Sequence, residues 1–342
     1  MIWRETVTRM TPRPLFDLYI ASCLPDGGVL HALLNEDGTL TPKERVKAPS
    51  PMFLCFGDGG IYALLRSPFP EPVSGLTHLP FAENGALYAP GQTVATGGVV
   101  ACHLCRWRGQ VYAVNYLSGS VARISYPAGL TALDIHPGKG VDPLRQDMAH
   151  THFIAPAPDG EYLLSTDLGL DTVYTYDEKL RVVSEAAVPA GHGARHLAYS
   201  PDGRFVYCVN ELKNTVTVFA YDKGVLTAIR TVDALGGCDR PTKAAAIRLK
   251  EGILYVSHRG DDSIALLRAE GAEVSFLGKY PCRGKSPRDL DLFGDFLVCT
   301  NEEDGKVTVF RLEKGGLRYC STLEIENPLC VIGKEIGKEA IQ

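Results

Sequence analysis

The chain has 342 residues, of which 45% are hydrophobic, and its 35 Lys and Arg residues are nearly balanced by 40 Asp and Glu residues. This composition allows a sizeable buried core. It is not typical of a disordered chain, nor of a nucleic-acid-binding surface, which is usually basic. Length alone suggests about two domains, but all-β folds of this size often form one unit.

No stretch reaches the roughly 18 apolar residues of a membrane-spanning helix, so we expect no membrane contact. The first 20 residues mix charge and proline and do not resemble a signal peptide. The chain contains ten cysteines, several of them within apolar runs such as "VYCVN" and "FLVCTN". Buried free thiols explain this pattern better than a disulfide framework, which is typical of small secreted domains. We therefore predict a cytoplasmic protein.

An internal repeat organises the chain. Each copy has an apolar strand, a turn rich in polar residues and Gly, and a second strand with alternating apolar residues. Two copies near the start are weak, and five later copies are clear and recur every 43 to 52 residues. In chain order the turns fall near Ser22 in "LYIASCLPDGGVLHALL", near Arg66 in "IYALLRSPF", at Asn115 in "QVYAVNYLSGSVARISY", at Asp167 in "YLLSTDLGLDTVYTYD", at Asn210 in "FVYCVNELKNTVTVFAYD", at His258 in "ILYVSHRGDDSIALL" and at Asn301 in "FLVCTNEEDGKVTVFRLE".

Seven such copies predict an all-β fold, a seven-bladed β-propeller with four antiparallel strands in each blade. We expect one propeller domain over residues 1–342, since no linker divides the chain. The first strands, around Leu18 to Leu34, lack an inner strand before them, whereas Leu329 to Ile332 forms an isolated apolar run near the end. We therefore predict that the C-terminal strand completes the blade begun by the N-terminus, which closes the ring.

A second polar cluster lies 12 to 15 residues before several of the turns, in or just before the predicted inner strand. Inner strands line the channel of a propeller, so these clusters are expected to meet at one mouth of that channel. Arg favours carboxylate or phosphate, and His accepts a proton near neutral pH. The pattern therefore predicts a pocket for an anionic, carbonyl-bearing ligand. Its residues are His103 in "ACHLC", His152 in "HTHFI", Arg195 and His196 in "GARHL" and Arg288 in "SPRDL", joined by Glu211 and Arg259 from the turns.

At these residues the sequence resembles the lactonase family of seven-bladed β-propellers, which includes propeller-type 6-phosphogluconolactonases and 3-carboxy-cis,cis-muconate lactonizing enzymes. The resemblance runs from about Leu15 to Ile332. It is carried by "CHLCRWRGQVYAVNYLSGSV", "RQDMAHTHFIAPAPDGEYLLSTDLGLDTVYTYD", "GHGARHLAYSPDGRFVYCVNELKNTVTVFAYD", "YVSHRGDDSIALL" and "SPRDLDLFGDFLVCTNEEDGKVTVF".

The resemblance implies a catalytic set of His152, Arg195, Glu211 and Arg259. His103, His150 and Arg288 also match positions typical of the family, and together with His196 they form the expected substrate-binding set. The chain departs from the family pattern at His258, Asp261 and Ala194, where relatives often have Asn, His and Pro. These departures leave the catalytic set intact but put the exact substrate in doubt.

The leading hypothesis is a lactone hydrolase that uses no metal or cofactor, and 6-phosphogluconolactone is the substrate that the resemblance implies. Arg195, Arg259 and Arg288 would hold phosphate or the developing oxyanion, and His152 would act as general base or acid. One alternative is cyclisation of a carboxylated muconate to a lactone. Another is a propeller that binds a ligand or partner without turnover, since a fold does not fix a function.

Metal binding is a further hypothesis. His150 and His152 lie two apart, which on a strand places both rings on one face, and His103 offers a third ligand. Cys102 and Cys105 lie three apart and would face opposite sides of a strand, and no second cysteine pair of suitable spacing accompanies them. We therefore expect no metal site.

Overall fold

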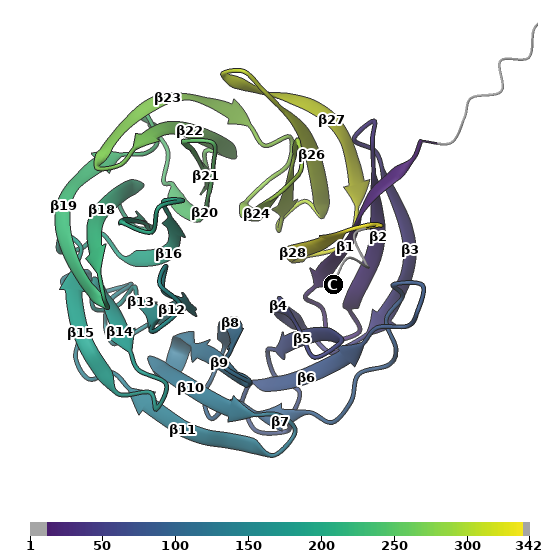
Figure 1. Cartoon of the computed structure of the whole chain (residues 1–342), viewed down its shortest axis with the longest axis horizontal. Coiled ribbons are helices and arrows are strands. Elements are labelled where there is room, and N and C mark those ends of the chain that lie inside the picture. The colour runs from purple at the N-terminus through teal and green to yellow at the C-terminus, as the bar shows by residue number, and fades with distance from the viewer. Residues whose placement is uncertain (1–11, 338–342) are drawn as a thin grey trace, which may run out of the picture.

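The computed structural model describes residues 12–337, and these form seven four-stranded antiparallel sheets arranged in a ring. Figure 1 shows the sheets as blades arranged around a common centre, with one strand of each blade nearest that centre and one at the rim. The innermost strands are β4 (Pro51–Gly57), β8 (Ala101–Trp107), β12 (Thr151–Pro156), β16 (Ala194–Tyr199), β20 (Lys243–Lys250), β24 (Pro287–Phe293) and β28 (Pro328–Glu335).

The other three strands of each blade follow outward in chain order. Second are β1 (Pro14–Ser22), β5 (Gly60–Leu65), β9 (Gln110–Asn115), β13 (Leu163–Asp167), β17 (Phe205–Asn210), β21 (Ile253–Arg259) and β25 (Phe296–Asn301). Third are β2 (Gly28–Asn35), β6 (Gly75–Pro80), β10 (Ser120–Ser125), β14 (Thr172–Tyr176), β18 (Thr215–Asp222), β22 (Ser263–Glu270) and β26 (Lys306–Glu313). Outermost are β3 (Leu40–Lys47), β7 (Val94–Ala95), β11 (Gly129–Ile135), β15 (Val182–Ala187), β19 (Val225–Asp233), β23 (Glu273–Pro281) and β27 (Gly316–Glu324).

The first blade closes the ring, as the sequence predicts. Strand β28 pairs with β1 in antiparallel register from Phe16–Glu335 to Ser22–Pro328, so the sheet order is β28-β1-β2-β3. The two ends of the described chain are thereby held in one sheet. The only helical element in residues 12–337 is the 3-10 turn η1 (Tyr116–Ser118).

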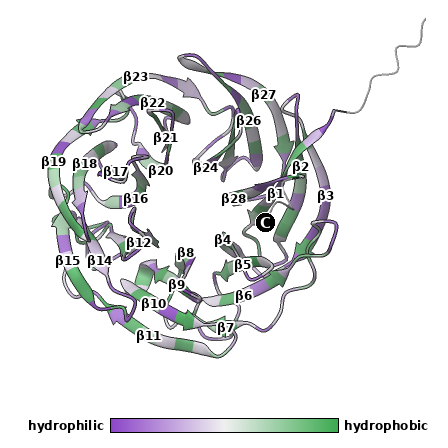
Figure 2. Cartoon of the chain, in the orientation of Figure 1, coloured by the Kyte–Doolittle hydropathy of each residue, from purple (hydrophilic) through white to green (hydrophobic). Residues whose placement is uncertain are grey.

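The middle strands are buried on both faces, because each blade packs against a neighbour on either side. In β5 and β25, for example, every residue is buried. The outer strands instead alternate between exposed and half-buried residues, as in β15. Hydrophobic residues are accordingly spread around the whole ring (Figure 2). This distribution explains why the strand signal is clear in the sequence: apolar runs mark middle strands, and alternation marks outer strands.

The predicted turn residues Asn115, Asp167, Asn210 and Asn301 are fully buried and end the second strands of their blades. Their side chains hold the following turn. Asn210 donates to the hydroxyls of Thr215 and Thr217 at 2.9 Å. The turns fixed in this way place Tyr116, Glu211 and Glu302, which follow three of these positions, beside the cavities described below.

Candidate functional site

Six of the seven innermost strands have a β-bulge at their second residue, and in β20 the irregularity lies further along, between Ala244 and Ile247. In β12, Thr151 pairs with Asp167 but the next pair is Phe153 with Thr166, which leaves His152 as the extra residue. A bulge re-aims a side chain and is common beside active sites. The corresponding extra residues of the other blades that line the channel are Met52, Cys102, Arg195, Arg288 and Leu329.

This register revises one detail of the sequence alignment. Cys102, not His103, occupies the position equivalent to His152, Arg195 and Arg288. His103 lies one residue further along its strand and is equivalent to Phe153 and His196. The register follows from the pairs on either side of the bulge: Ala101 pairs with Asn115 as Thr151 pairs with Asp167, and the residue after each is the extra one.

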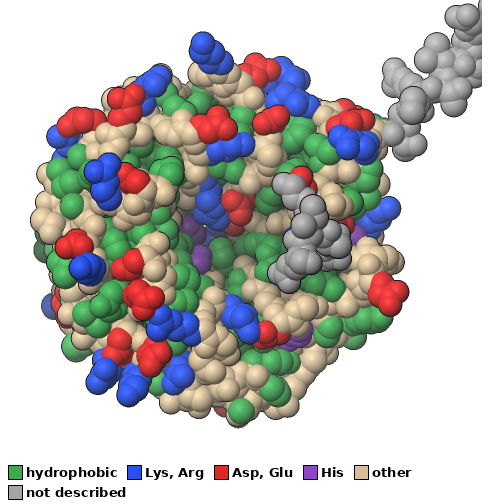
Figure 3. Space-filling model, viewed as in Figure 1, with side chains coloured by type: hydrophobic (Ala, Val, Ile, Leu, Met, Phe, Trp, Pro, Cys, Tyr) green, Lys and Arg blue, Asp and Glu red, His purple; other side chains and the backbone are tan. Residues whose placement is uncertain are grey.

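Six bulge residues and the residues that follow the turns meet in the channel. Figure 3 shows that the centre of the ring is hollowed and that histidine and charged side chains lie within the hollow. The site cavity has a volume of about 340 Å³. Its polar lining comprises Arg66, Cys102, Tyr116, Arg145, His152, Glu211, Arg259 and Arg288.

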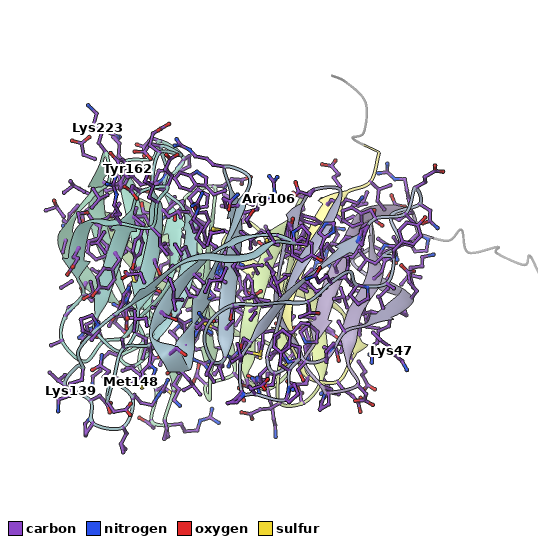
Figure 4. All side chains as sticks on the ribbon, turned by 90° about the horizontal axis from the view of Figure 1, so that it is seen from below. Lys47, Arg106, Lys139, Met148, Tyr162 and Lys223 are labelled. Carbon is purple, nitrogen blue, oxygen red and sulfur yellow. The ribbon has the colours of Figure 1, made fainter. Side chains whose placement is uncertain are left out.

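The site cavity lies toward the edge of the ring at which the innermost strands begin. Figure 4 shows Met148, which lies just before β12, at the edge opposite Arg106, which lies near the end of β8. The innermost strands therefore run from the mouth of the site cavity towards the other end of the channel.

An ion cage formed by Glu211, Arg145, Arg195 and Arg259 makes up one side of the cavity. Glu211 Oε1 accepts from Arg145 Nη2 at 2.7 Å, and Oε2 accepts from Arg195 Nε at 3.0 Å and Arg259 Nη2 at 2.7 Å. The Glu211 side chain is only 3% exposed and that of Arg195 only 2%. Charge-assisted hydrogen bonds of this kind fix both partners in position.

The ion cage controls the ionisation of its own members. Burial by itself would raise the pKa of Glu211, but the charges of Arg259, Arg195 and Arg145 outweigh it and hold that pKa well below its usual range. Burial and the neighbouring Arg259 lower the pKa of Arg195 to about 9. Glu211 is therefore a carboxylate and Arg195 is a cation at neutral pH.

Positive charge exceeds negative charge around the cavity. Glu211 neutralises one arginine of its cage, and Arg288 is paired with Glu302 at 3.2 Å. Among the described residues, the Arg66 guanidinium group contacts only the sulfur of Met52, at 3.1 Å. Buried guanidinium nitrogens of Arg145, Arg195 and Arg259 have no hydrogen-bond partner within residues 12–337. Unpaired buried donors are costly, so this arrangement favours an anionic guest.

His152 faces this cluster of cations. Its ring lies 5.3 Å from that of His196 and 5.6 Å from that of Tyr116, measured between centroids. Burial and the charge of Arg195 hold the His152 pKa well below its ordinary value. His152 is therefore neutral at neutral pH and has a lone pair with which to accept a proton.

His103 and His196 lie deeper in the channel than the arginines and form its floor together with Phe53 and Phe153. The His103 ring lies 4.2 Å from Phe53, 4.4 Å from Phe153 and 5.3 Å from His196. Both histidines are buried, and burial is the main cause that lowers their pKa values well below the ordinary value. Neither lines the 340 Å³ cavity, so their predicted contact with substrate stays a prediction.

His150 is turned away from the cavity although it precedes His152 by only two residues. Its ring stacks on Tyr116 at 4.4 Å, and its nitrogens face the Tyr116 carbonyl at 3.0 Å and Asp147 at 3.3 Å. The bulge at His152 separates the two rings, which therefore do not act as a chelating pair. Within the described range 12–337, no group of three or more His, Cys, Asp or Glu side chains is placed to hold a metal ion.

Four residues of the polar lining were not predicted from the sequence as site residues: Arg66, Cys102, Tyr116 and Arg145. Tyr116 and Arg66 follow the turn positions as Glu211 does, so alignment of the repeats could have found them. Arg145 comes from the connection between β11 and β12, which lies outside the repeat. Its Nη2 also contacts the Tyr116 hydroxyl at 3.2 Å.

A wider depression of about 860 Å³ adjoins the site cavity, and Arg259 lines both. Acidic residues line much of it, namely Glu302, Glu303, Asp304 and Glu326, together with Lys243. The depression therefore differs in charge from the cavity, and it offers carboxylates that can accept hydrogen bonds from hydroxyl groups.

The family model described as "Lactonase, 7-bladed beta-propeller" matches residues 17–332, which is nearly the whole propeller. The chain belongs to this family. Residues 12–337 contain no helix long and apolar enough to cross a membrane.

Solved structures of similar fold include two with printed functions. A periplasmic gluconolactonase of Pseudomonas aeruginosa is 23% identical, with a TM-score of 0.85 over 93% of this chain and 99% of that chain. A Bacteroides uniformis protein described as a "putative 6-phosphogluconolactonase" is 25% identical, with a TM-score of 0.85 over 94% of this chain and 100% of that chain.

Among curated relatives, an uncharacterized protein of Staphylococcus saprophyticus is 33% identical over 222 residues, which is 60% of this chain and 61% of the relative. A Staphylococcus aureus protein, also uncharacterized, is 36% identical over 202 residues, which is 55% of this chain and 59% of the relative. The chain thus spans about three fifths of the length of the curated relatives it matches.

Proposed function

We propose that this lactonase-family protein hydrolyses a lactone that carries an anionic group, with 6-phosphogluconolactone as the leading substrate. The observation that supports this best is the site cavity itself, where neutral His152 faces unpaired donors of Arg145 and Arg259 and the charge of Arg195. A substrate with both a lactone carbonyl and a phosphate group matches that combination. The structural similarity to a "putative 6-phosphogluconolactonase" favours the same substrate.

The proposed reaction begins with His152 as general base. His152 takes a proton from a water molecule as the water oxygen attacks the lactone carbonyl carbon. The carbonyl oxygen gains negative charge, which Arg195 and Arg259 stabilise. The C–O bond of the ring then breaks, and protonated His152 returns its proton to the departing ring oxygen. The product is a hydroxy acid, and His152 is neutral again.

Glu211 has a positioning role in this proposal. Its carboxylate holds three guanidinium groups in fixed orientation, so they need not reorganise when charge develops on the substrate. The unpaired donors of Arg145 and Arg259 remain available to the phosphate or to the oxyanion, and Arg195 adds its positive charge. Small hydroxylated lactones also suit the adjoining acidic depression, where substrate hydroxyls can donate to carboxylates.

The test is the rate of ring opening of 6-phosphoglucono-δ-lactone, followed by proton release at pH values from about 6 to 8. We expect acceleration over the spontaneous rate, and a higher kcat/KM than for glucono-δ-lactone, which lacks the phosphate. His152→Gln is expected to lower kcat by about 10² to 10⁴-fold. The control is His192→Gln, because His192 lines neither cavity and bonds Thr215 at 2.9 Å.

No acceleration of either lactone across this pH range would contradict the proposal. Conversion of 3-carboxy-cis,cis-muconate, measured by absorbance, would instead support the cyclisation alternative.

Since all ten cysteines are free thiols, the cytoplasmic location also stays part of the proposal.

A further inference from the structure

A small chamber extends the site deeper along the innermost strands. Its volume is about 10 Å³, which is close to the space that one water molecule needs. His152 and Arg288 line both the chamber and the site cavity. The chamber is further lined by Arg195, His196 and Asp289.

Four of the residues around this chamber have buried polar atoms without a hydrogen-bond partner in the described part of the chain. The atoms are His152 Nδ1, both ring nitrogens of His196, Arg195 Nη1 and Asp289 Oδ2. Buried polar groups almost always have a partner, and a buried water typically makes two to four hydrogen bonds. The four hydrogen bonds that one water can make therefore match these four residues in number.

Arg248 binds one carboxylate oxygen of Asp289 but not the other. Its residue is 1% exposed, and Oδ1 accepts from Arg248 Nη2 at 3.3 Å. Arg248 Nε also donates to Asp291 Oδ1 at 3.1 Å. Arg248 thus orients the Asp289 carboxylate, and within residues 12–337 its Oδ2 has no hydrogen-bond partner. Burial raises the pKa of this carboxyl, and the charge of Arg248 and the backbone N–H of Val331 oppose that shift.

We propose that the chamber holds one ordered water that links Asp289 Oδ2 to His152 Nδ1, which makes Asp289 a positioning residue for His152. The water accepts from His152 Nδ1–H and from Arg195 Nη1–H, and it donates to Asp289 Oδ2 and to one ring nitrogen of His196. This arrangement fixes the tautomer of His152, so its Nε2 lone pair faces the site cavity. The inference rests on the proposed role of His152 as general base.

The link also acts on the protonated state of His152. That side chain faces the cations Arg195, Arg259 and Arg288, the carboxylate of Glu211, the thiol of Cys102, the phenol of Tyr116 and the neutral ring of His196. Asp289 adds a second negative charge through the water when His152 carries a proton. Loss of that charge makes the protonated form less favourable.

The test compares Asp289→Asn with Asp291→Asn. Both carboxylates hold Arg248, but only Asp289 lines the chamber, so Asp291→Asn controls for a purely structural effect. For Asp289→Asn we expect kcat for 6-phosphoglucono-δ-lactone to fall roughly tenfold to a hundredfold with KM changed less than about twofold. We also expect the acidic limb of the rate–pH profile to move to lower pH. Asp291→Asn is expected to stay within about twofold of the wild type. Equal effects of the two variants, or an effect on KM alone, would overturn the proposal.

A crystal structure of the ligand-free wild-type protein tests the water independently of activity. We expect one water within about 3.2 Å of both His152 Nδ1 and Asp289 Oδ2. A dry chamber, or a ring of His152 whose Nδ1 faces the site cavity, would overturn the proposal even if the lactonase activity is present. Conversely, an ordered water in a protein that opens no lactone would separate failure of the proposed function from failure of this inference.

Discussion

The ion cage around Glu211 and the histidines at the channel floor are both buried, yet they are stabilised in opposite ways. In the cage, three arginines keep a carboxylate ionised against the effect of burial. On the floor, His103 and His196 pack against Phe53 and Phe153 and stay neutral because they are buried. One channel therefore holds ionised residues at its mouth and, a few residues deeper, neutral histidines beside the ion pair of Asp289 with Arg248.

His152 lies at the boundary between these two regions. It lines the charged cavity and also contacts the ring of His196. This position gives it a neutral lone pair beside fixed cations, which is what a general base for an anionic substrate requires. Substitutions and a pH change that affect one region more than the other test this contrast.

Glu211→Gln is expected to have the largest effect after loss of His152, because it leaves three buried arginines without their common carboxylate. Breaking a buried ion pair on one side costs about 3–5 kcal/mol, so the free energy of unfolding should fall by that amount. We expect kcat/KM for 6-phosphoglucono-δ-lactone to fall at least about 10²-fold. Urea unfolding and initial rates measure the two effects.

Glu302→Gln is the matched control for Glu211→Gln. Glu302 also pairs with an arginine, Arg288, but its side chain is 26% exposed. A partly exposed pair contributes about 0–1 kcal/mol to stability. The free energy of unfolding should therefore fall much less for Glu302→Gln than for Glu211→Gln. A similar fall in the free energy of unfolding for both variants would show that burial does not strengthen the ion cage.

As the pH falls, we expect the buried histidines to lower the stability of the protein at pH values where Glu211 of the ion cage is still ionised. Below pH about 6.5 the unfolded chain protonates its histidines, whereas buried His103, His152 and His196 stay neutral because their pKa values are lowered. The unfolded state then binds more protons, so stability falls as pH drops, by up to about 1.4 kcal/mol per pH unit for each histidine. His31 has the opposite effect and offsets the stability lost through one such histidine. Burial lowers the pKa of His31, but hydrogen bonding to Asp17 and the charge of Glu44 outweigh this and raise that pKa.

Urea unfolding at pH 7.5 and pH 5.5 tests this expectation. His258, whose pKa burial lowers to about 4, adds to the three histidines named above. With the contribution of His31 subtracted, the free energy of unfolding should be about 4 kcal/mol lower at pH 5.5. The pKa of Glu211 is held low, so the cage contributes nothing to this difference in that range. Unchanged stability at pH 5.5 would mean that the floor histidines are already protonated or accessible to solvent.

His103→Phe is expected to have the smallest effect. The ring contacts with Phe53 and Phe153 can be kept, and the loss is the acceptor for the backbone N–H of Ile154 at 3.4 Å. We expect a loss of about 1 kcal/mol in stability and less than a threefold change in kcat/KM. A large rise in KM would instead place His103 in contact with substrate, as the sequence predicts.

The sequence predicts the fold well because each repeat shows the residue periodicity of β-strands. Asn115, Asp167, Asn210 and Asn301 end the second strands of their blades, and the C-terminal strand closes the ring against β1. Membership of the family is confirmed over residues 17–332. These features depend on local patterns that a single chain displays.

The details of the site depend on geometry that the local pattern does not display. A bulge places Cys102 rather than His103 beside His152, and it turns His150 towards Tyr116. Arg145 reaches Glu211 from a connection that carries no repeat. Sequence alignment could name the elements that meet at the channel but could not give the orientation of each side chain.

The most direct test of the central claim is a crystal structure of the protein with 6-phosphogluconate, the product of the proposed reaction. We expect the product in the site cavity, with its carboxylate in hydrogen-bond contact with His152 and with Arg195 or Arg259, and with its phosphate on the remaining arginine donors. Binding elsewhere on the propeller, or binding in the cavity without contact to His152, would contradict the account.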